Sequence, residues 1–164
     1  MLYARGGRQP FEGRNISMTK DVLVSIRGLQ FAGGEENDPV EVISSGTYYK
    51  KNGKHYILYD EVMEGVAEPT RNVIKIGESC LDITKRGAVN VHMMFEQDKK
   101  NVTYYYTPYG SLLIGIDATR IDVKEQEQDL SVTVEYGLDV NYEHVSDCTI
   151  EMRVKNKTAG DFRI

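Results

Sequence analysis

The stretch Leu130-Ser-Val-Thr-Val-Glu-Tyr-Gly-Leu-Asp-Val-Asn-Tyr142 carries the clearest secondary-structure signal in the chain. Its seven even-numbered positions are apolar or Tyr, and its six odd-numbered positions are polar or Gly. This period of two is typical of an antiparallel β-strand with one packed face and one face in water. The stretch would span roughly 44 Å, which is long for a single strand, so we expect a bulge or a sharp coil at Gly137.

The same alternation recurs along most of the chain from Asp21 onward. Residues 147–157 repeat it and should pair with the first stretch as its neighbour. Further strands are expected at residues 22–26, 72–76, 80–85, 89–95 and 112–116. Residues 122–129 are polar and mostly charged, which favours an exposed loop. No segment shows the period of an ordinary amphipathic helix.

Turn signals separate these strands. Asn52-Gly53 is the strongest, because both residues tolerate the positive φ of a type I′ hairpin. A turn there places Tyr49 opposite Tyr56 and Tyr48 opposite Ile57. Shorter signals follow at residues 85–88, 97–100 and 107–110. The sequence therefore predicts an all-β protein, an antiparallel meander of nine to ten strands. Closure into a barrel would remove its two exposed edges; a flattened sandwich is the alternative.

The chain has 164 residues, which fits one compact domain. Residues 1–17 hold three Arg, one Glu and no periodicity, so we expect a disordered N-terminal extension followed by a single domain over residues 18–164. Met18 is the expected start of that domain. A short basic arm that touches a partner is the alternative.

The charge of the chain argues against several partners. The formal net charge is −5, and it becomes −7 without residues 1–17. An acidic surface disfavours nucleic acids and anionic membranes, because both present phosphate. The sequence also lacks an apolar run of about 18–20 residues and a secretory signal. We expect a soluble, cytoplasmic protein that binds neither nucleic acid nor membrane.

Motifs for catalysis or metal binding are missing from the sequence. Cys80 and Cys148 have no zinc-type spacing, and we interpret them as small buried hydrophobic residues. The three His are scattered, and His55, beside the Asn-Gly turn, is expected to be exposed. The acidic residues 33–38 lack the ligand order of a calcium loop. We therefore expect no cofactor and no metal, and we favour a protein that is not an enzyme.

The predicted strands divide the tyrosines between the inner and outer faces of the sheet. Tyr59 and Glu61 point the same way on one strand, and a buried carboxylate needs a partner, for which Arg86 is the candidate. Such a pair could orient the polar group of a small ligand or simply hold the barrel closed. Alternation sends Tyr105 to the apolar side and leaves Tyr104 and Tyr106 outside.

Three longer strings carry a family resemblance: residues 46–61, 83–87 and 103–110. Their order and spacing resemble the YwiB-like family of uncharacterised bacterial proteins, from Met18 to the C-terminus. The resemblance implies a calycin fold, that is, a lipocalin-like barrel, and it carries over no catalytic residues. The residues that match the strings and could face inward as ligand-binding residues are Tyr59, Glu61, Arg86, Tyr105 and Thr107.

The sequence therefore supports two hypotheses for the function. The first is a lipocalin-like barrel that binds a small, partly apolar ligand in its interior. The second is a protein-interaction or structural module that acts through an outer tyrosine-rich face, with a homodimer as the expected form.

Overall fold

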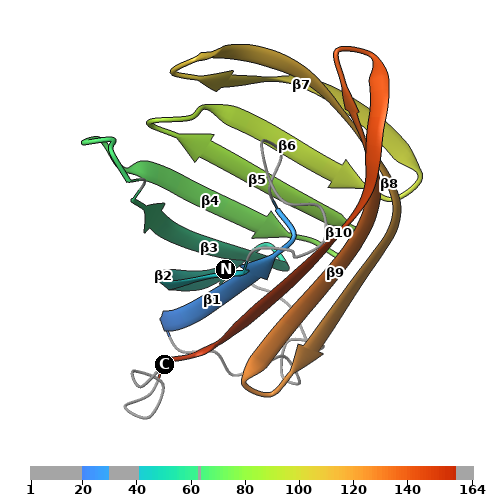
Figure 1. The fold of residues 1–164 in the computed structure, drawn as a ribbon. Coiled ribbons are helices and arrows are strands. Elements are labelled where there is room, and N and C mark those ends of the chain that lie inside the picture. Colours follow the sequence, from blue (N-terminus) through green and yellow to red (C-terminus); the bar gives the residue numbers. More distant parts are fainter. Residues whose placement is uncertain (1–19, 30–40, 63, 158–164) are drawn as a thin grey trace.

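The computed structural model describes residues 20–29, 41–62 and 64–157 (Figure 1). These residues form ten antiparallel strands and no helix. The strands are β1 (Asp21–Arg27), β2 (Glu41–Lys51), β3 (Lys54–Glu61), β4 (Thr70–Ile76), β5 (Cys80–Arg86), β6 (Val91–Glu96), β7 (Lys99–Thr107), β8 (Gly110–Gln126), β9 (Asp129–Val140) and β10 (Glu143–Asn156). The expected extension at residues 1–17, its end at Met18 and the acidic residues 33–38 lie outside the described residues.

The strands make one sheet that closes almost completely into a barrel (Figure 1). The sheet follows the order β6-β5-β4-β3-β2-β1-β10-β9-β8-β7, so the first and last strands pair in its middle. Val22 lies opposite Asn156 at one end of that pairing, and Arg27 lies opposite Glu151 at the other. The predicted all-β barrel is confirmed, and the sandwich alternative is not.

The remaining gap in the barrel lies between β6 and β7. A two-residue turn joins these strands, yet they share no continuous ladder. An isolated bridge between Asn90 and Tyr106 connects them at one end. Near the turn, Asn101 Nδ2 donates to the Met94 carbonyl (3.1 Å) and to Glu96 Oε1 (3.2 Å). Side-chain hydrogen bonds thus replace part of the missing ladder.

The long alternating stretch forms β9, and its even positions face the interior as predicted. The strand ends at Val140, because Asn141 and Tyr142 adopt positive φ in the turn to β10. The prediction of a bulge at Gly137 is wrong, because Gly137 pairs with both neighbouring strands. The register shifts instead occur on the two neighbouring strands, between Ala118 and Arg120 and between His144 and Ser146.

The prediction of a loop over residues 122–129 is also wrong. Strand β8 continues to Gln126, and only two residues turn the chain into β9. Ile121 is buried and Val123 is half-buried against the core. These inward positions keep the strand pattern, while the charged residues between them point to solvent. Charge on the outer face alone therefore does not end a strand.

Side chains from both walls fill the middle of the barrel. Phe95 on β6 meets Tyr136 on β9 edge to face, with ring centroids 5.0 Å apart. Aliphatic residues such as Ile74, Ile116 and Ile150 are fully buried around them. Cys80 and Cys148 were expected in the core, but both are only half-buried. The inward charged, amide and imidazole side chains of the described residues lie toward the two ends of the barrel.

The Asn-Gly turn has the predicted geometry. Asn52 and Gly53 have φ of 54° and 77°, and Tyr49 pairs with Tyr56 as expected. The described residues contain no helix long and apolar enough to cross a membrane.

Candidate functional site

One end of the barrel interior holds a cluster of polar side chains from β3, β4 and β5. The buried Lys85 ammonium donates to Asn72 Oδ1 (2.7 Å) and to Glu61 Oε1 (3.0 Å). Asn72 Nδ2 donates to the same Glu61 oxygen (3.2 Å). Asn72 is fully buried, the Lys85 side chain is 10% exposed and the Glu61 side chain is 31% exposed. We call Glu61, Asn72 and Lys85 the mouth cluster.

The mouth cluster keeps hydrogen-bonding capacity. Its bonds within the described residues use two of the three Lys85 donors and only Oε1 of Glu61. The Lys85 ammonium can therefore still donate one hydrogen bond. Beside it, Oε2 of the partly exposed Glu61 carboxylate can still accept one. A ligand with both an acceptor and a donor would match the mouth cluster.

Two tyrosines converge on the same carboxylate. Tyr59 projects inward from β3, and Tyr105 packs against the core from β7. Burial raises the pKa of both phenols, and the Glu61 charge raises it further in each. Both hydroxyls therefore stay protonated near neutral pH, and each ring adds an apolar wall beside the mouth cluster.

Three of the five ligand-binding residues expected from the sequence thus come together: Tyr59, Glu61 and Tyr105. Arg86 does not join them, because it lies on the outer face of β5 and the inward position beside it is Lys85. The expected pair of Glu61 with Arg86 is therefore wrong. The Thr107 hydroxyl donates to the Gly110 carbonyl (2.8 Å) and accepts from the Tyr109 amide, so it holds the β7–β8 turn.

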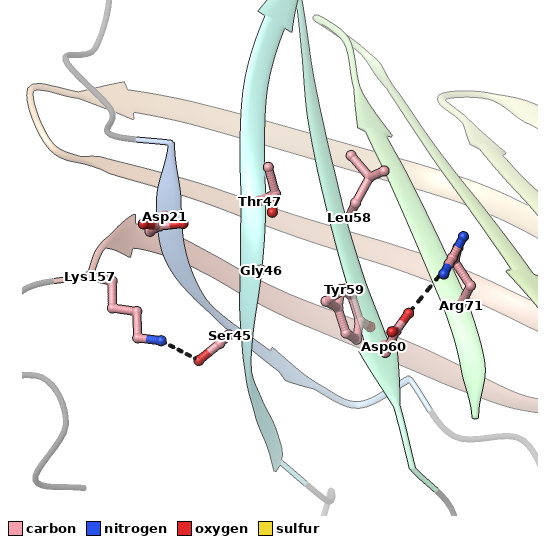
Figure 2. Close-up of a pocket in the computed structure, with 9 residues that line it drawn as sticks. All are labelled: Asp21, Ser45, Gly46, Thr47, Leu58, Tyr59, Asp60, Arg71 and Lys157. Carbon is pink, nitrogen blue, oxygen red and sulfur yellow. Dashed lines mark hydrogen bonds and ion pairs between the residues drawn. The ribbon is translucent and has the colours of Figure 1, made fainter. Parts of the chain in front are cut away.

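A hollow of about 510 Å³ lies outside the barrel next to Tyr59 (Figure 2). The ladder between β2 and β3 ends at Thr47 and Leu58, and both residues line the hollow. Gly46 and Tyr59 both line it. A Cβ at Gly46 would lie 2.9 Å from the Leu58 carbonyl oxygen, so glycine allows the close approach there. The Tyr59 ring therefore separates the outer hollow from the mouth cluster.

A second group of hydrogen-bonded polar side chains lies toward the other end of the barrel. His55 is 1% exposed, so its expected exposure is wrong. Its Nε2 lies 2.9 Å from Glu125 Oε2, and its Nδ1 lies 2.8 Å from the Tyr48 hydroxyl. A carboxylate only accepts, so Nε2 carries the proton and Nδ1 accepts from Tyr48. Burial, followed by the Glu125 charge, raises the Tyr48 pKa to about 12.

The outer tyrosines lie where the sequence placed them. Tyr104 and Tyr106 are each about half exposed on β7, and their rings stack at 5.9 Å. Val102 and Tyr109 continue the exposed row along the strand and its turn. Among the described residues, no three His, Cys, Asp or Glu gather closely enough to hold a metal ion.

Comparison with known proteins gives a family and a fold. The family described as "Domain of unknown function (DUF1934)" matches residues 24–152, which is most of the chain. The chain belongs to the DUF1934 family. The ywiB protein from Bacillus subtilis has a similar crystal structure, with a TM-score of 0.71 and 18% sequence identity over 90% of this chain and 99% of that one. The resemblance seen in the sequence is thereby confirmed. No curated protein matches the chain.

The polar residues of this DUF1934 barrel that sequence reasoning missed share one signal. Lys85 follows Leu81 and Ile83 at a spacing of two, and Glu125 follows Ile121 and Val123 in the same way. Alternation alone therefore assigns both to the inner face, although their charge suggests the outer one. Asn72 alternates with Ile74 and Ile76 and is found by the same rule.

We predict that His55 makes the stability of this DUF1934 protein sensitive to acid. Burial lowers the His55 pKa, against the opposing effect of Glu125; the Lys50 charge lowers it further. The unfolded chain therefore takes up the proton first, near pH 6.5. The stabilisation is complete above that pH and is lost as the pH falls below it, by at most about 1.4 kcal/mol per pH unit.

Urea unfolding between pH 7.5 and pH 5 measures this effect. His55→Gln should reduce the fall in the free energy of unfolding, while the control His92→Gln, at a half-exposed histidine, should leave it in place. Equal falls in the wild type and in His55→Gln would contradict the assignment.

Proposed function

We propose that this protein binds a small, partly apolar ligand at the mouth cluster, between Tyr59 and Tyr105. The observation that carries the proposal is the Lys85–Glu61 pair, which projects into the barrel with bonding capacity to spare. The proposal keeps the lipocalin-like architecture and the cytoplasmic location expected from the sequence.

The energetics of the mouth cluster support binding over a purely structural role. Removing two charges from water costs free energy that their mutual attraction seldom returns, and an apolar pair of similar volume often serves stability equally well. The central section of this barrel is already closed by apolar packing. A charged pair beside it is therefore better explained by a polar group that it receives.

The chemistry of the site restricts the ligand. Lys85 suits an anionic or carbonyl oxygen, and Glu61 suits a hydroxyl or amine hydrogen. The two tyrosine rings suit an apolar or aromatic body. A ligand with an oxygen-bearing head and a flat apolar body fits all of these groups.

We predict that the anionic apolar dye 1-anilinonaphthalene-8-sulfonate binds saturably to one site. The double variant Lys85→Met with Glu61→Gln keeps the pair electrically neutral and should weaken binding by about tenfold, the value of one charge-assisted hydrogen bond. Tyr105→Leu should also weaken it. Fluorescence titration gives the dissociation constants.

Tyr104→Leu is the matched control, because Tyr104 is the neighbouring tyrosine on the outer face of the same strand. It should leave the dye affinity unchanged. If Tyr104→Leu weakens the dye as much as Tyr105→Leu does, the dye binds outside and the proposed interior site fails.

A second candidate function is self-association through the outer face of β7. The exposed row of Val102, Tyr104, Tyr106 and Tyr109 favours it, since aromatic residues are enriched in protein interfaces. In this account the partner is a second copy of the chain.

Sedimentation velocity at increasing protein concentration tests this second candidate. We predict a shift from monomer to dimer that the double variant Tyr104→Ser with Tyr106→Ser abolishes. A monomer at every concentration up to the millimolar range would exclude it.

A further inference from the structure

Arg86 has a different role from the one its sequence suggested. It lies on the outer face of β5, directly opposite Arg71 on β4. Arg71 in turn lies opposite Asp60 on β3. The three side chains form a row across neighbouring strands. Figure 2 shows Asp60 and Arg71 joined by an ion pair.

The charges in this row are incompletely balanced. Like charges directly opposite each other in a sheet destabilise it. Arg71 Nε lies 3.5 Å from Asp60 Oδ1, which engages one edge of its guanidinium. Arg86 makes no ion pair or hydrogen bond with any described residue. Within the described residues, the terminal nitrogens of both guanidinium groups have no such partner and can receive an anion.

A hollow of about 650 Å³ lies over these residues. Besides Asp60, Arg71 and Arg86, its lining is Glu68, Pro69, Gly87 and Asn90. It is a separate place from the mouth cluster, because Arg86 and Lys85 are consecutive residues that point to opposite faces of β5.

The walls of the hollow are held by short-range contacts. Gly87 has φ of 146°, and a Cβ there would lie 2.2 Å from the Pro69 carbonyl oxygen, so the two loops pack directly together. Asn90 Nδ2 donates to the Gly87 carbonyl (3.0 Å), and Asn90 Oδ1 accepts from the Gly87 amide (3.3 Å). The backbone beside Arg86 is therefore preorganised for binding.

We propose that this hollow binds the phosphate group of a small phosphorylated polyhydroxy molecule. A guanidinium group donates two parallel bonds to two phosphate oxygens, and a tetrahedral dianion has further oxygens for a second guanidinium, whereas one guanidinium is enough for a carboxylate. The volume exceeds what phosphate alone fills. Asp60 and Glu68 lie in the same hollow as acceptors for the hydroxyl groups of the ligand.

The formal charges of the hollow limit which phosphorylated molecules fit. Two arginines balance the two carboxylates, and the whole chain carries −5. Long-range attraction for polyanions is therefore missing, and nucleic acids are disfavoured. Selection depends on the short bonds to Arg71 and Arg86, which suits one phosphate on an otherwise neutral body.

Nuclear magnetic resonance titration of the 15N-labelled full chain tests the proposal, with glucose 6-phosphate as probe and glucose and sodium chloride as controls at matched ionic strength. We expect saturable shifts at the Gly87 and Asn90 amides with the phosphorylated sugar alone. Arg86→Gln should weaken its binding by about tenfold or more, the effect of losing a charge-assisted bond. Inorganic phosphate should bind more weakly than glucose 6-phosphate.

Arg27→Gln is the control variant, because Arg27 is an exposed outer-face arginine elsewhere on the sheet, and it should bind as the wild type does. Arg86 is exposed and makes no ion pair or hydrogen bond with a described residue, so Arg86→Gln should keep the fold and its spectrum. Shifts that do not saturate, that chloride reproduces, or that persist in Arg86→Gln would overturn the proposal. So would phosphate binding as tightly as the sugar phosphate. Tyr105→Leu should not affect this binding, which keeps the result separate from the test of the interior site.

Discussion

The pairing of β1 with β10 is the constraint on which the rest of this barrel depends. It joins the two ends of the described chain through an antiparallel ladder from Val22 and Asn156 to Arg27 and Glu151. Without it, the sheet would expose the edges of β1 and β10 in addition to those of β6 and β7. Because the pairing closes the barrel, alternate side chains along each strand face either the barrel interior or the solvent. Because it joins residues so far apart in the chain, it is costly in loop-closure entropy and should form late in folding.

Closure gives every inward side chain a fixed environment, and this explains where polar groups are tolerated. The central section is packed with residues such as Phe95, Tyr136 and Ile116. Among the described residues, the inward charged, amide and imidazole groups lie toward the ends. His55 is bonded through both ring nitrogens, and Lys85 is bonded to an amide and a carboxylate. The two ends differ in one respect. The bonds of His55 are complete, whereas the mouth cluster retains a donor and an acceptor.

Most of the architecture could be predicted from the sequence, because strand alternation and turn chemistry are local signals. The Asn52-Gly53 turn determined the register of its hairpin, and β9 buried the expected face. The errors have a common cause, which is that charge or nearness to a turn outweighs strand parity in these predictions. Residues 122–129 were expected to form a loop because they are charged, His55 was expected to be exposed because it lies beside the Asn-Gly turn, and Arg86 beside Gly87 was expected to pair with Glu61. In each case the parity of neighbouring apolar residues indicated the observed face.

Other features could not be predicted from one sequence at all. The gap between β6 and β7 follows a two-residue turn that would ordinarily continue a ladder, and only the closed barrel shows that the strands separate. The bulges on β8 and β10 likewise depend on how long strands bend around a packed core. The convergence of Tyr59 and Tyr105 on Glu61 joins β3 to β7, and sequence alternation gives no distance between strands so far apart.

The central claim is that the mouth cluster receives a small molecule, and native mass spectrometry of gently purified full-length protein tests it most directly. The account predicts a native mass above that of the bare chain, an excess that disappears on denaturation. The excess should also be missing from the double variant Lys85→Met with Glu61→Gln. Identical native and denatured masses in the wild type would contradict the claim, and so would an excess that the double variant retains in full.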